Sequence, residues 1–415
     1  MALIPMMRLV MLLMGLALVA AACGVAESEQ SDTPNPTESK PADVATTPPA
    51  ATTSEAEDDF LPFQLLQVTR AWDTDFSNST IDLNELQVGI PSSDPRDAIP
   101  PIDSPVFESV SDSEWIQDPE PGVLLDINGD ARFYPLSVLT RHEIVNDEVG
   151  GTPVAVTYCP LCNTAVVFDR RFEEEVLRLG VSGLLRNSDL VMWDDSSQSL
   201  WQQITGEAIV GTHAGKRLMP IGSGIVRWAD FKTTHPDGKA LGPDQGRGTV
   251  YGYNPYEFYS SRARPYGFFT GEIDDRYPAL ERVVGVSVDG VDKAYPFSVI
   301  NDALVVNDTV ADRPVVVFWG AEDTADALDS GVIADAAGVG TGIAYDPIVD
   351  GRVLTFDALG DSEFVDRETG SAWSILGKAI DGELAGTELD LITHRNEFWF
   401  AWQAFFPDAE VWAGS

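Results

Sequence analysis

Residues 128–159 read NGDARFYPLSVLTRHEIVNDEVGGTPVAVTYC, and residues 289–320 read DGVDKAYPFSVINDALVVNDTVADRPVVVFWG. The two stretches align without a gap at a constant offset of 161 residues, which is 289 minus 128. Both place a glycine second in the alignment, and both share a Tyr-Pro pair, a Val-Asn-Asp triplet and a later proline. Because so long an ungapped match is not expected by chance, the sequence predicts an internal duplication.

The two copies extend beyond these stretches. Further matches, among them SLWQQITGEAIVG (199–211) and SAWSILGKAIDGE (371–383), extend the first copy over residues 120–241 and the second over residues 281–415. Between the copies, residues 242–280 form a connector that is rich in aromatic side chains.

Each copy has the local pattern of a strand-rich unit. VLLDING followed by ARFYP predicts a hairpin around Asn128-Gly129, which is a strong tight-turn signal. PLSVLTRH begins with a proline and predicts a short helix, whereas EIVND, TPVAVTY and TAVVFDR predict further strands. The aromatic segments VRWADFKTTHPD and FWFAWQAFFPD each predict a short closing helix. We expect a strand-dominated α+β fold of two tandem, pseudo-symmetric repeats related by a pseudo-twofold axis.

The N-terminal residues predict export and lipid anchoring. Arg8 precedes an apolar run that ends at Cys23 and is too short to cross a bilayer. The ending LVAAAC resembles a bacterial lipoprotein signal, so we expect residues 1–22 to be removed and Cys23 to carry the lipid. An ordinary secretory signal with a chance cysteine is the alternative. In both cases the mature chain is expected outside the cytoplasm; lipidation would anchor it to a membrane of the cell envelope.

Two segments precede the first copy. Residues 23–59 consist mostly of Ser, Thr, Pro, Ala and acidic residues, and they have little apolar surface to bury. Such a composition cannot offset the entropy lost on ordering, so a disordered tether is predicted. Residues 60–119 are interpreted as a lead-in segment.

The charge of the chain excludes one class of partner. The sequence has 66 acidic and 26 basic residues, and its formal net charge is −40. A field of this sign repels nucleic acid, so no nucleic-acid partner is expected. The oligomeric state is left open by the sequence.

The duplication separates residues that the fold requires from residues that are free to serve chemistry. Positions kept in both copies are explained by a shared fold, whereas positions altered in one copy are not. His142 corresponds to Ala303, and Cys159 corresponds to Gly320. The first copy therefore holds both internal cysteines and three of the four histidines of the chain.

The motif VTYCPLC places Cys159 and Cys162 at the end of a predicted strand, and His142 lies at the start of the neighbouring strand. Pairing of these strands would bring the three positions to one edge of the sheet. Two thiolates and an imidazole suit Zn²⁺ or Cu⁺, because soft sulfur and borderline nitrogen match these ions. The leading prediction is a metal site of these three residues, with Asp147, His235 or water as the fourth ligand.

The same cysteines allow two other roles. Their spacing is that of thiol–disulfide couples, but NTAVVFDR after Cys162 predicts a strand in place of the helix that lowers the thiol pKa in such sites. The pair could also close a small structural disulfide outside the cytoplasm. Whether the protein is an enzyme is left open.

A non-catalytic binding module is the remaining alternative. The aromatic side chains are expected mainly to pack in the core, but some could line a groove between the copies for an apolar or sugar-like ligand. The residues assigned to this groove are Trp201, Gln202, Trp228 and Tyr256. RNSDLVMWDD, residues 186–195, gathers carboxylates without the spacing of a calcium loop and is interpreted as a solvated strand edge.

Several of these strings resemble one family. RDAIPPIDSPVF, VTYCPLCNTAVVFDR, SLWQQITGEAIVG and FWFAWQAFFPD are similar to the bacterial and archaeal domain-of-unknown-function family 3179, and the likeness runs from about Trp72 to Trp412. The resemblance implies that members are often exported or lipid-anchored. Its histidine and CxxC pattern corresponds to His142, Cys159 and Cys162. It implies no established activity or cofactor.

Overall fold

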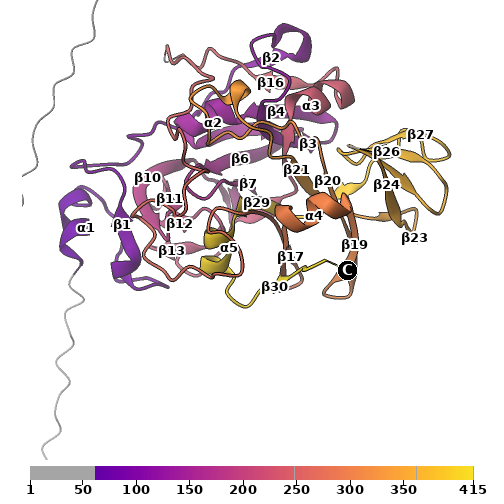
Figure 1. The fold of residues 1–415 in the computed structure, drawn as a ribbon. Helices are drawn as coiled ribbons and strands as arrows, with labels where there is room; N and C mark the ends of the chain where they lie inside the picture. The colour runs from indigo at the N-terminus through magenta and orange to yellow at the C-terminus, as the bar shows by residue number, and fades with distance from the viewer. Residues whose placement is uncertain (1–60, 247, 361, 415) are drawn as a thin grey trace, which may run out of the picture. The chain divides into compact units, whose positions relative to one another are not determined.

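Short strands dominate the part of the chain that the structure describes. The computed structural model describes residues 61–246, 248–360 and 362–414, and the predicted signal and tether lie outside them. These ranges contain 30 strands and five short α-helices, all within one unit of the chain (Figure 1). The predicted strand-dominated fold with short helices is confirmed.

Four sheets are built from residues 86–241. Their strand orders are β15-β3-β4-β16-β2, β14-β7-β6-β5, β1-β10-β11-β12-β13 and β8-β9. The bounds of these strands are β1 Leu86–Val88, β2 Phe107–Ser109, β3 Pro121–Ile127, β4 Asp130–Pro135, β5 Ile144–Val149, β6 Thr152–Cys159, β7 Thr164–Asp169, β8 Arg171–Phe172, β9 Glu175–Val176, β10 Leu179–Arg186, β11 Asp189–Asp194, β12 Leu200–Gln202, β13 Ala208–Val210, β14 Met219–Ile221, β15 Gly224–Arg227 and β16 Lys239–Leu241.

Four further sheets are built from residues 282–411. Their strand orders are β29-β17-β18-β30, β19-β20-β21-β28, β24-β25-β26-β27 and β22-β23. The bounds of these strands are β17 Arg282–Val288, β18 Val291–Pro296, β19 Val305–Val310, β20 Arg313–Gly320, β21 Thr341–Asp346, β22 Ile348–Val349, β23 Arg352–Val353, β24 Phe356–Gly360, β25 Glu363–Asp366, β26 Ala372–Ser374, β27 Ala379–Asp381, β28 Asp390–Leu391, β29 His394–Phe398 and β30 Glu410–Val411.

The helices are single short segments between the strands. The α-helices are α1 Phe63–Val68, α2 Leu136–His142, α3 Trp228–Thr234, α4 Phe297–Ala303 and α5 Trp399–Phe405. The short 3-10 helices are η1 Leu83–Glu85, η2 Val110–Asp112 and η3 Ile333–Asp335. Helices α3 and α5 are the aromatic closing helices that the sequence predicts.

The predicted hairpin and the helix after it form as the sequence indicates. Asn128 (φ 56°) and Gly129 (φ 80°) are both in the left-handed region, as a tight two-residue hairpin turn between β3 and β4 requires. Helix α2 begins directly after Pro135, whose ring fixes a backbone angle that suits a helix start. It ends at His142, and Glu143, with φ 60°, follows before the chain enters β5.

The two predicted copies share an order of elements. The segments β17, β18, α4, β19 and β20 each begin and end 161 residues after β3, β4, α2, β5 and β6. A buried contact also recurs, because the Tyr134 hydroxyl donates to Asp147 and the Tyr295 hydroxyl donates to Asp308. The pseudo-twofold relation between the copies and the boundaries of the segments stay predictions.

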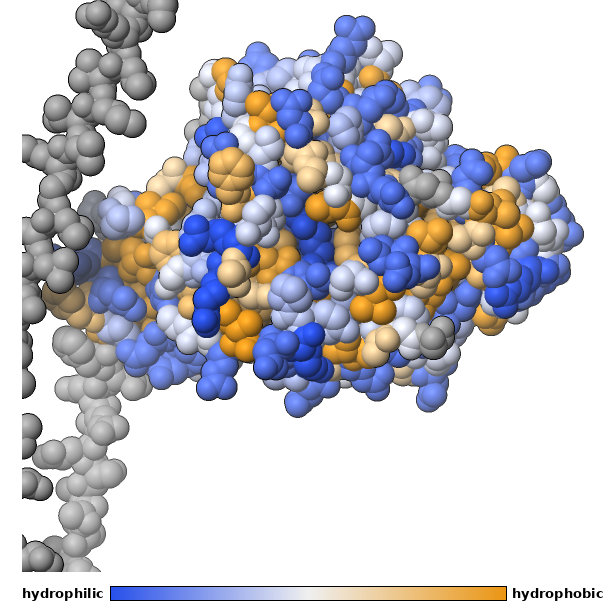
Figure 2. Space-filling view, viewed as in Figure 1, coloured by the Kyte–Doolittle hydropathy of each residue, from blue (hydrophilic) through white to orange (hydrophobic). Residues whose placement is uncertain are grey.

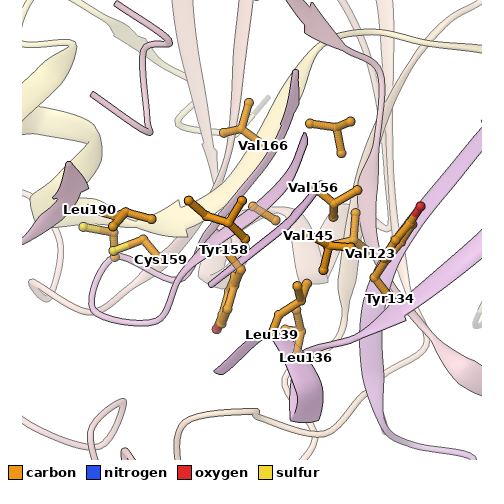
Figure 3. Packing of buried hydrophobic residues seen from close by; sticks show 14 of the residues in the cluster. Val123, Tyr134, Leu136, Leu139, Val145, Val156, Tyr158, Cys159, Val166 and Leu190 are labelled. Carbon is orange, nitrogen blue, oxygen red and sulfur yellow. The ribbon is translucent and has the colours of Figure 1, made fainter. Parts of the chain in front are cut away.

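The largest apolar cluster surrounds β5, β6 and β7. Strands β5 and β6 pair antiparallel, with Ile144 opposite Thr157, and β7 pairs along the other side of β6. Figure 3 shows side chains of this cluster from α2, β5 and β6, together with Cys159. Strand β29, from the second copy, lies against β7 (Figure 1). The CxxC motif is therefore part of the core.

The surface mixes polar and apolar side chains. On the face in Figure 2, hydrophilic residues are distributed among hydrophobic ones. Among the described residues, no helix combines the length and the apolar character that crossing a bilayer requires.

The recurring tyrosine–aspartate contact allows a matched test of stability. We expect Tyr134→Phe to lower the free energy of unfolding by about 1.5–3 kcal/mol, since it removes a buried hydrogen bond to a charged group. We expect a smaller loss for Tyr295→Phe, because the Asp308 side chain is more exposed than that of Asp147, 20% against 7%. Urea unfolding of both variants measures the difference. A loss in Tyr295→Phe equal to or above that in Tyr134→Phe would contradict this account.

Candidate metal centre

The CPLC segment is a tight turn between two paired strands. Cys159 ends β6 opposite Thr164, the first residue of β7. The Cys162 amide donates to the Cys159 carbonyl at 3.3 Å, and Asn163 has φ 54°. The expectation that a strand and not a helix follows Cys162 is confirmed by β7. Because the turn folds inward, the thiols of Cys159 and Cys162 are both buried, with residue exposures of 2% and 0%.

A carboxylate joins the two thiols. The Sγ atoms of Cys159 and Cys162 and a carboxylate oxygen of Asp189 all lie within 4.8 Å of one another. Neither cysteine forms a disulfide. Asp189 begins β11 directly after Asn187 and Ser188, which both have positive φ, so a sharp turn directs this strand end to the cysteines. Two thiols and one carboxylate thus form a buried group of potential metal ligands.

One oxygen of Asp189 is held by two amide donors and the other by none. Its Oδ2 accepts hydrogen bonds from the Gln202 side-chain amide at 2.6 Å and from the Ile204 backbone amide at 3.0 Å. Its Oδ1 is buried and has no nitrogen or oxygen donor among the described residues, although the Cys159 thiol hydrogen-bonds to the carboxyl. A buried acceptor without such a donor is costly, so this oxygen is available to a ligand.

Burial sets the protonation of the group. It raises the pKa of the Cys159 thiol and raises the pKa of the Cys162 thiol still further above its ordinary range. Burial also raises the pKa of Asp189 to about 7, although the hydrogen bonds from Gln202, Ile204 and the Cys159 thiol each lower it. Without a bound cation, both thiols are therefore protonated at neutral pH.

Two more buried carboxyl groups lie near the cysteines. Burial, followed by the charge of Asp189, raises the pKa of Glu143 to about 8. Burial also raises the pKa of Glu397 to about 8, although the Arg395 guanidinium opposes the shift. A hydrogen bond from the Thr164 side chain also opposes the raised pKa of Glu397.

Glu397 reaches the site on a strand of the second copy. Strand β29 is fixed to the CPLC turn by two hydrogen bonds. The Phe398 amide donates to the Cys162 carbonyl at 2.9 Å, and the Asn163 side-chain amide donates to the Asn396 carbonyl at 3.4 Å. Both copies therefore contribute side chains to this region.

The structure does not bring His142 into the ligand group. Its Nδ1 lies 2.7 Å from the Pro100 carbonyl oxygen, and its Nε2 lies 2.8 Å from the Tyr251 hydroxyl. Both ring nitrogens are thus used in hydrogen bonds. The strand pairing that we predicted is present, but α2 ends at His142 and the left-handed turn at Glu143 follows. As a result it is the neighbouring residue, Glu143, that lies near the cysteines.

The two predicted fourth ligands also lie outside this group. Asp147 accepts hydrogen bonds at 2.6 Å from Arg132 and from the Tyr134 hydroxyl. The Nδ1 of His235 lies 3.9 Å from a carboxylate oxygen of Asp126. Asp189 takes the place that the sequence analysis gave to these residues.

The residues assigned to an aromatic groove have other roles. Trp201 and Trp228 are 0% and 2% exposed and belong to two different core clusters. Gln202 is buried and holds Asp189. Of these residues, Tyr256 alone lines the cavity that lies next to the CPLC turn.

The interpretation of RNSDLVMWDD as a solvated strand edge was wrong, because Asp189 is fully buried. Glu143 and Glu397 were also missed, although the duplication carries a signal for both. Glu143 stands where the second copy has Leu304, and Glu397 stands where the first copy has Val226. A carboxyl that replaces an apolar residue at a matched position marks a departure from the demands of the fold.

Comparison with known families supports the resemblance seen in the sequence. Residues 96–409 match the family described as "Protein of unknown function (DUF3179)". The chain belongs to this family. A comparison with curated proteins and another with solved structures each found no match. The comparisons therefore assign no activity and no ligand to the buried cysteines and carboxyls.

The buried carboxyls predict how the stability of the metal-free protein depends on pH. Glu143, Asp189 and Glu397 hold their protons more tightly in the folded than in the unfolded chain, so their contribution to stability is lost as pH rises through 7 and 8. We expect the free energy of unfolding to fall from about pH 4.5, where these carboxyls titrate in the unfolded chain, to about pH 8, by up to about 1.4 kcal/mol per pH unit for each group, and to level off above its folded-state pKa. Urea unfolding across this range measures the slope.

A pair of variants isolates one of these groups. Glu397→Gln removes a titrating carboxyl and should make the slope shallower, whereas Glu363→Gln, at an exposed position, should leave it unchanged. A slope that is the same in both variants would show that the Glu397 carboxyl is not protonated in the folded state.

Proposed function

We propose that this protein binds a soft or borderline metal ion through Cys159, Cys162 and Asp189. The observation that carries the proposal is the buried cluster of two thiols, which form no disulfide, and the Asp189 carboxyl, with all three possible ligand atoms within 4.8 Å of one another. A cation bound by all three groups would coordinate the Asp189 carboxyl and would stabilise the deprotonated thiols.

The ligand set favours Zn²⁺. Two thiolates and a carboxylate match its preference for sulfur together with nitrogen or oxygen, and a fourth position would remain for water or another ligand. Cu⁺ is the alternative occupant, and it would use the two sulfurs because it prefers soft ligands. Glu143 and Glu397 lie near the cysteines and would be the carboxyls that exchange a proton with a water molecule bound there.

Thiol–disulfide exchange is supported less well than metal binding. Reactive thiols have a lowered pKa, whereas burial raises the pKa of both Cys159 and Cys162. A strand follows the motif in place of the helix whose N-terminus lowers the pKa in such sites.

The cell envelope is the proposed location. The signal-like N-terminus and Cys23 support a lipoprotein that is anchored in a membrane and carries its folded part outside the cytoplasm. The strongly negative charge supports the absence of a nucleic-acid partner. In this setting the metal centre would serve metal handling or a metal-dependent reaction.

Metal content and free thiols test the proposal together. We expect tag-free protein that starts at residue 24, expressed in a periplasm, to contain about one zinc or copper per chain. Cys159→Ser and Cys162→Ser should lose the metal, because each removes a thiolate ligand. Elemental analysis and a thiol assay under denaturing conditions provide the measurements.

Two further variants separate the proposed ligands from the predicted histidine. Gln202→Leu removes the partner of Asp189 Oδ2 and should weaken metal affinity about 10- to 100-fold, as loss of a ligand's supporting hydrogen bond does. His142→Gln should keep the metal. Absence of metal together with loss of both free thiols would replace this proposal by a disulfide, and its reduction potential would then distinguish a redox couple from a structural bridge.

A further inference from the structure

A cavity of about 180 Å³ lies next to the metal centre. It adjoins the CPLC turn through Leu161 and the start of β11 through Leu190. Two other parts of the chain complete its wall, since Ile90 comes from the lead-in segment and Tyr256 from the aromatic connector. The connector is fixed here by a 2.7 Å hydrogen bond from the Tyr259 hydroxyl to the Leu161 carbonyl.

The wall of the cavity is mostly apolar, and its polar side chains are the Glu143 carboxyl and the hydroxyls of Tyr256 and Tyr266. Glu143 is the only residue with an ionisable carboxyl in this lining, and the Tyr256 hydroxyl is its hydrogen-bond partner. No lysine, arginine or histidine is among the described residues that line the cavity. An anionic ligand would therefore find no opposite charge here.

The carboxyl of Glu143 is not required by the fold. Leu304 occupies the matching position of the second copy with φ 61°, against 60° for Glu143. The left-handed turn thus belongs to the helix end in both copies, whereas the carboxyl belongs to the first copy alone. A buried carboxyl costs stability, so its presence in an apolar cavity indicates a role in binding.

We propose that this cavity binds a small, uncharged, ring-sized molecule whose hydroxyl group donates a hydrogen bond to the Glu143 carboxyl. An apolar protein cavity of about 150 Å³ is large enough for benzene, so the volume fits a molecule such as phenol. One hydroxyl matches the single carboxyl in the lining. An ammonium group, with three donors and a large desolvation cost, matches it less well. The proposal does not depend on the metal.

The test compares phenol with toluene on the full chain, by isothermal titration calorimetry. The two probes have similar size, but only phenol has a hydroxyl. We expect phenol to bind about fivefold to tenfold more tightly than toluene, as one hydrogen bond in a buried site provides. Glu143→Leu, which installs the residue of the second copy, should bind both probes equally.

Two tryptophan variants locate the binding. Ile90→Trp fills the cavity from the lead-in segment and should abolish binding of both probes. Val106→Trp, at a position that is 51% exposed and outside the lining, should leave binding unchanged and serves as the matched control. Urea unfolding verifies that each variant is folded.

Three outcomes would overturn the proposal. The first is no detectable binding of phenol, and the second is binding that survives in folded Ile90→Trp protein. The third is tighter binding of benzylamine than of phenol, which would make the site one for cationic amines.

Discussion

Burial of ionisable groups around the CPLC turn is the constraint on which this account depends. The thiols of Cys159 and Cys162 and the carboxyls of Glu143, Asp189 and Glu397 are all buried here. Burial destabilises the charged form of each of these groups, so the protonated forms are favoured unless a cation enters. The proposed metal ion would stabilise the deprotonated thiols and the carboxylate, which are the forms that burial disfavours.

The two halves of the chain contribute differently to the site. The first copy provides the thiols and Asp189, whereas β29 of the second copy covers the turn and supplies Glu397. The hydrogen bond from the Phe398 amide to the Cys162 carbonyl ties that strand to the motif. The connector adds a third part, because its tyrosines anchor the turn and line the adjacent cavity. The site is thus built where separate segments converge.

Local signals in the sequence predicted the fold well, and non-local contacts explain what they missed. The turn at Asn128-Gly129 and the strand after Cys162 follow from the conformational preferences of a few residues. Asp189 and Glu397 could not be placed by such preferences, because tertiary packing alone brings their strands to the cysteines. Strand pairing predicts the sheet edge at which His142 and the cysteines meet, but the exact end of α2 decides that Glu143, and not His142, lies near the thiols.

X-ray absorption at the zinc edge of the zinc-loaded chain tests the central claim most directly, because it reports the atoms bound to the metal. The account predicts two sulfur neighbours at about 2.3 Å and oxygen neighbours at about 2.0–2.2 Å, without the scattering pattern of an imidazole ring. An imidazole signal in the wild-type protein, or fewer than two sulfur neighbours of the zinc, would contradict a centre formed by Cys159, Cys162 and Asp189.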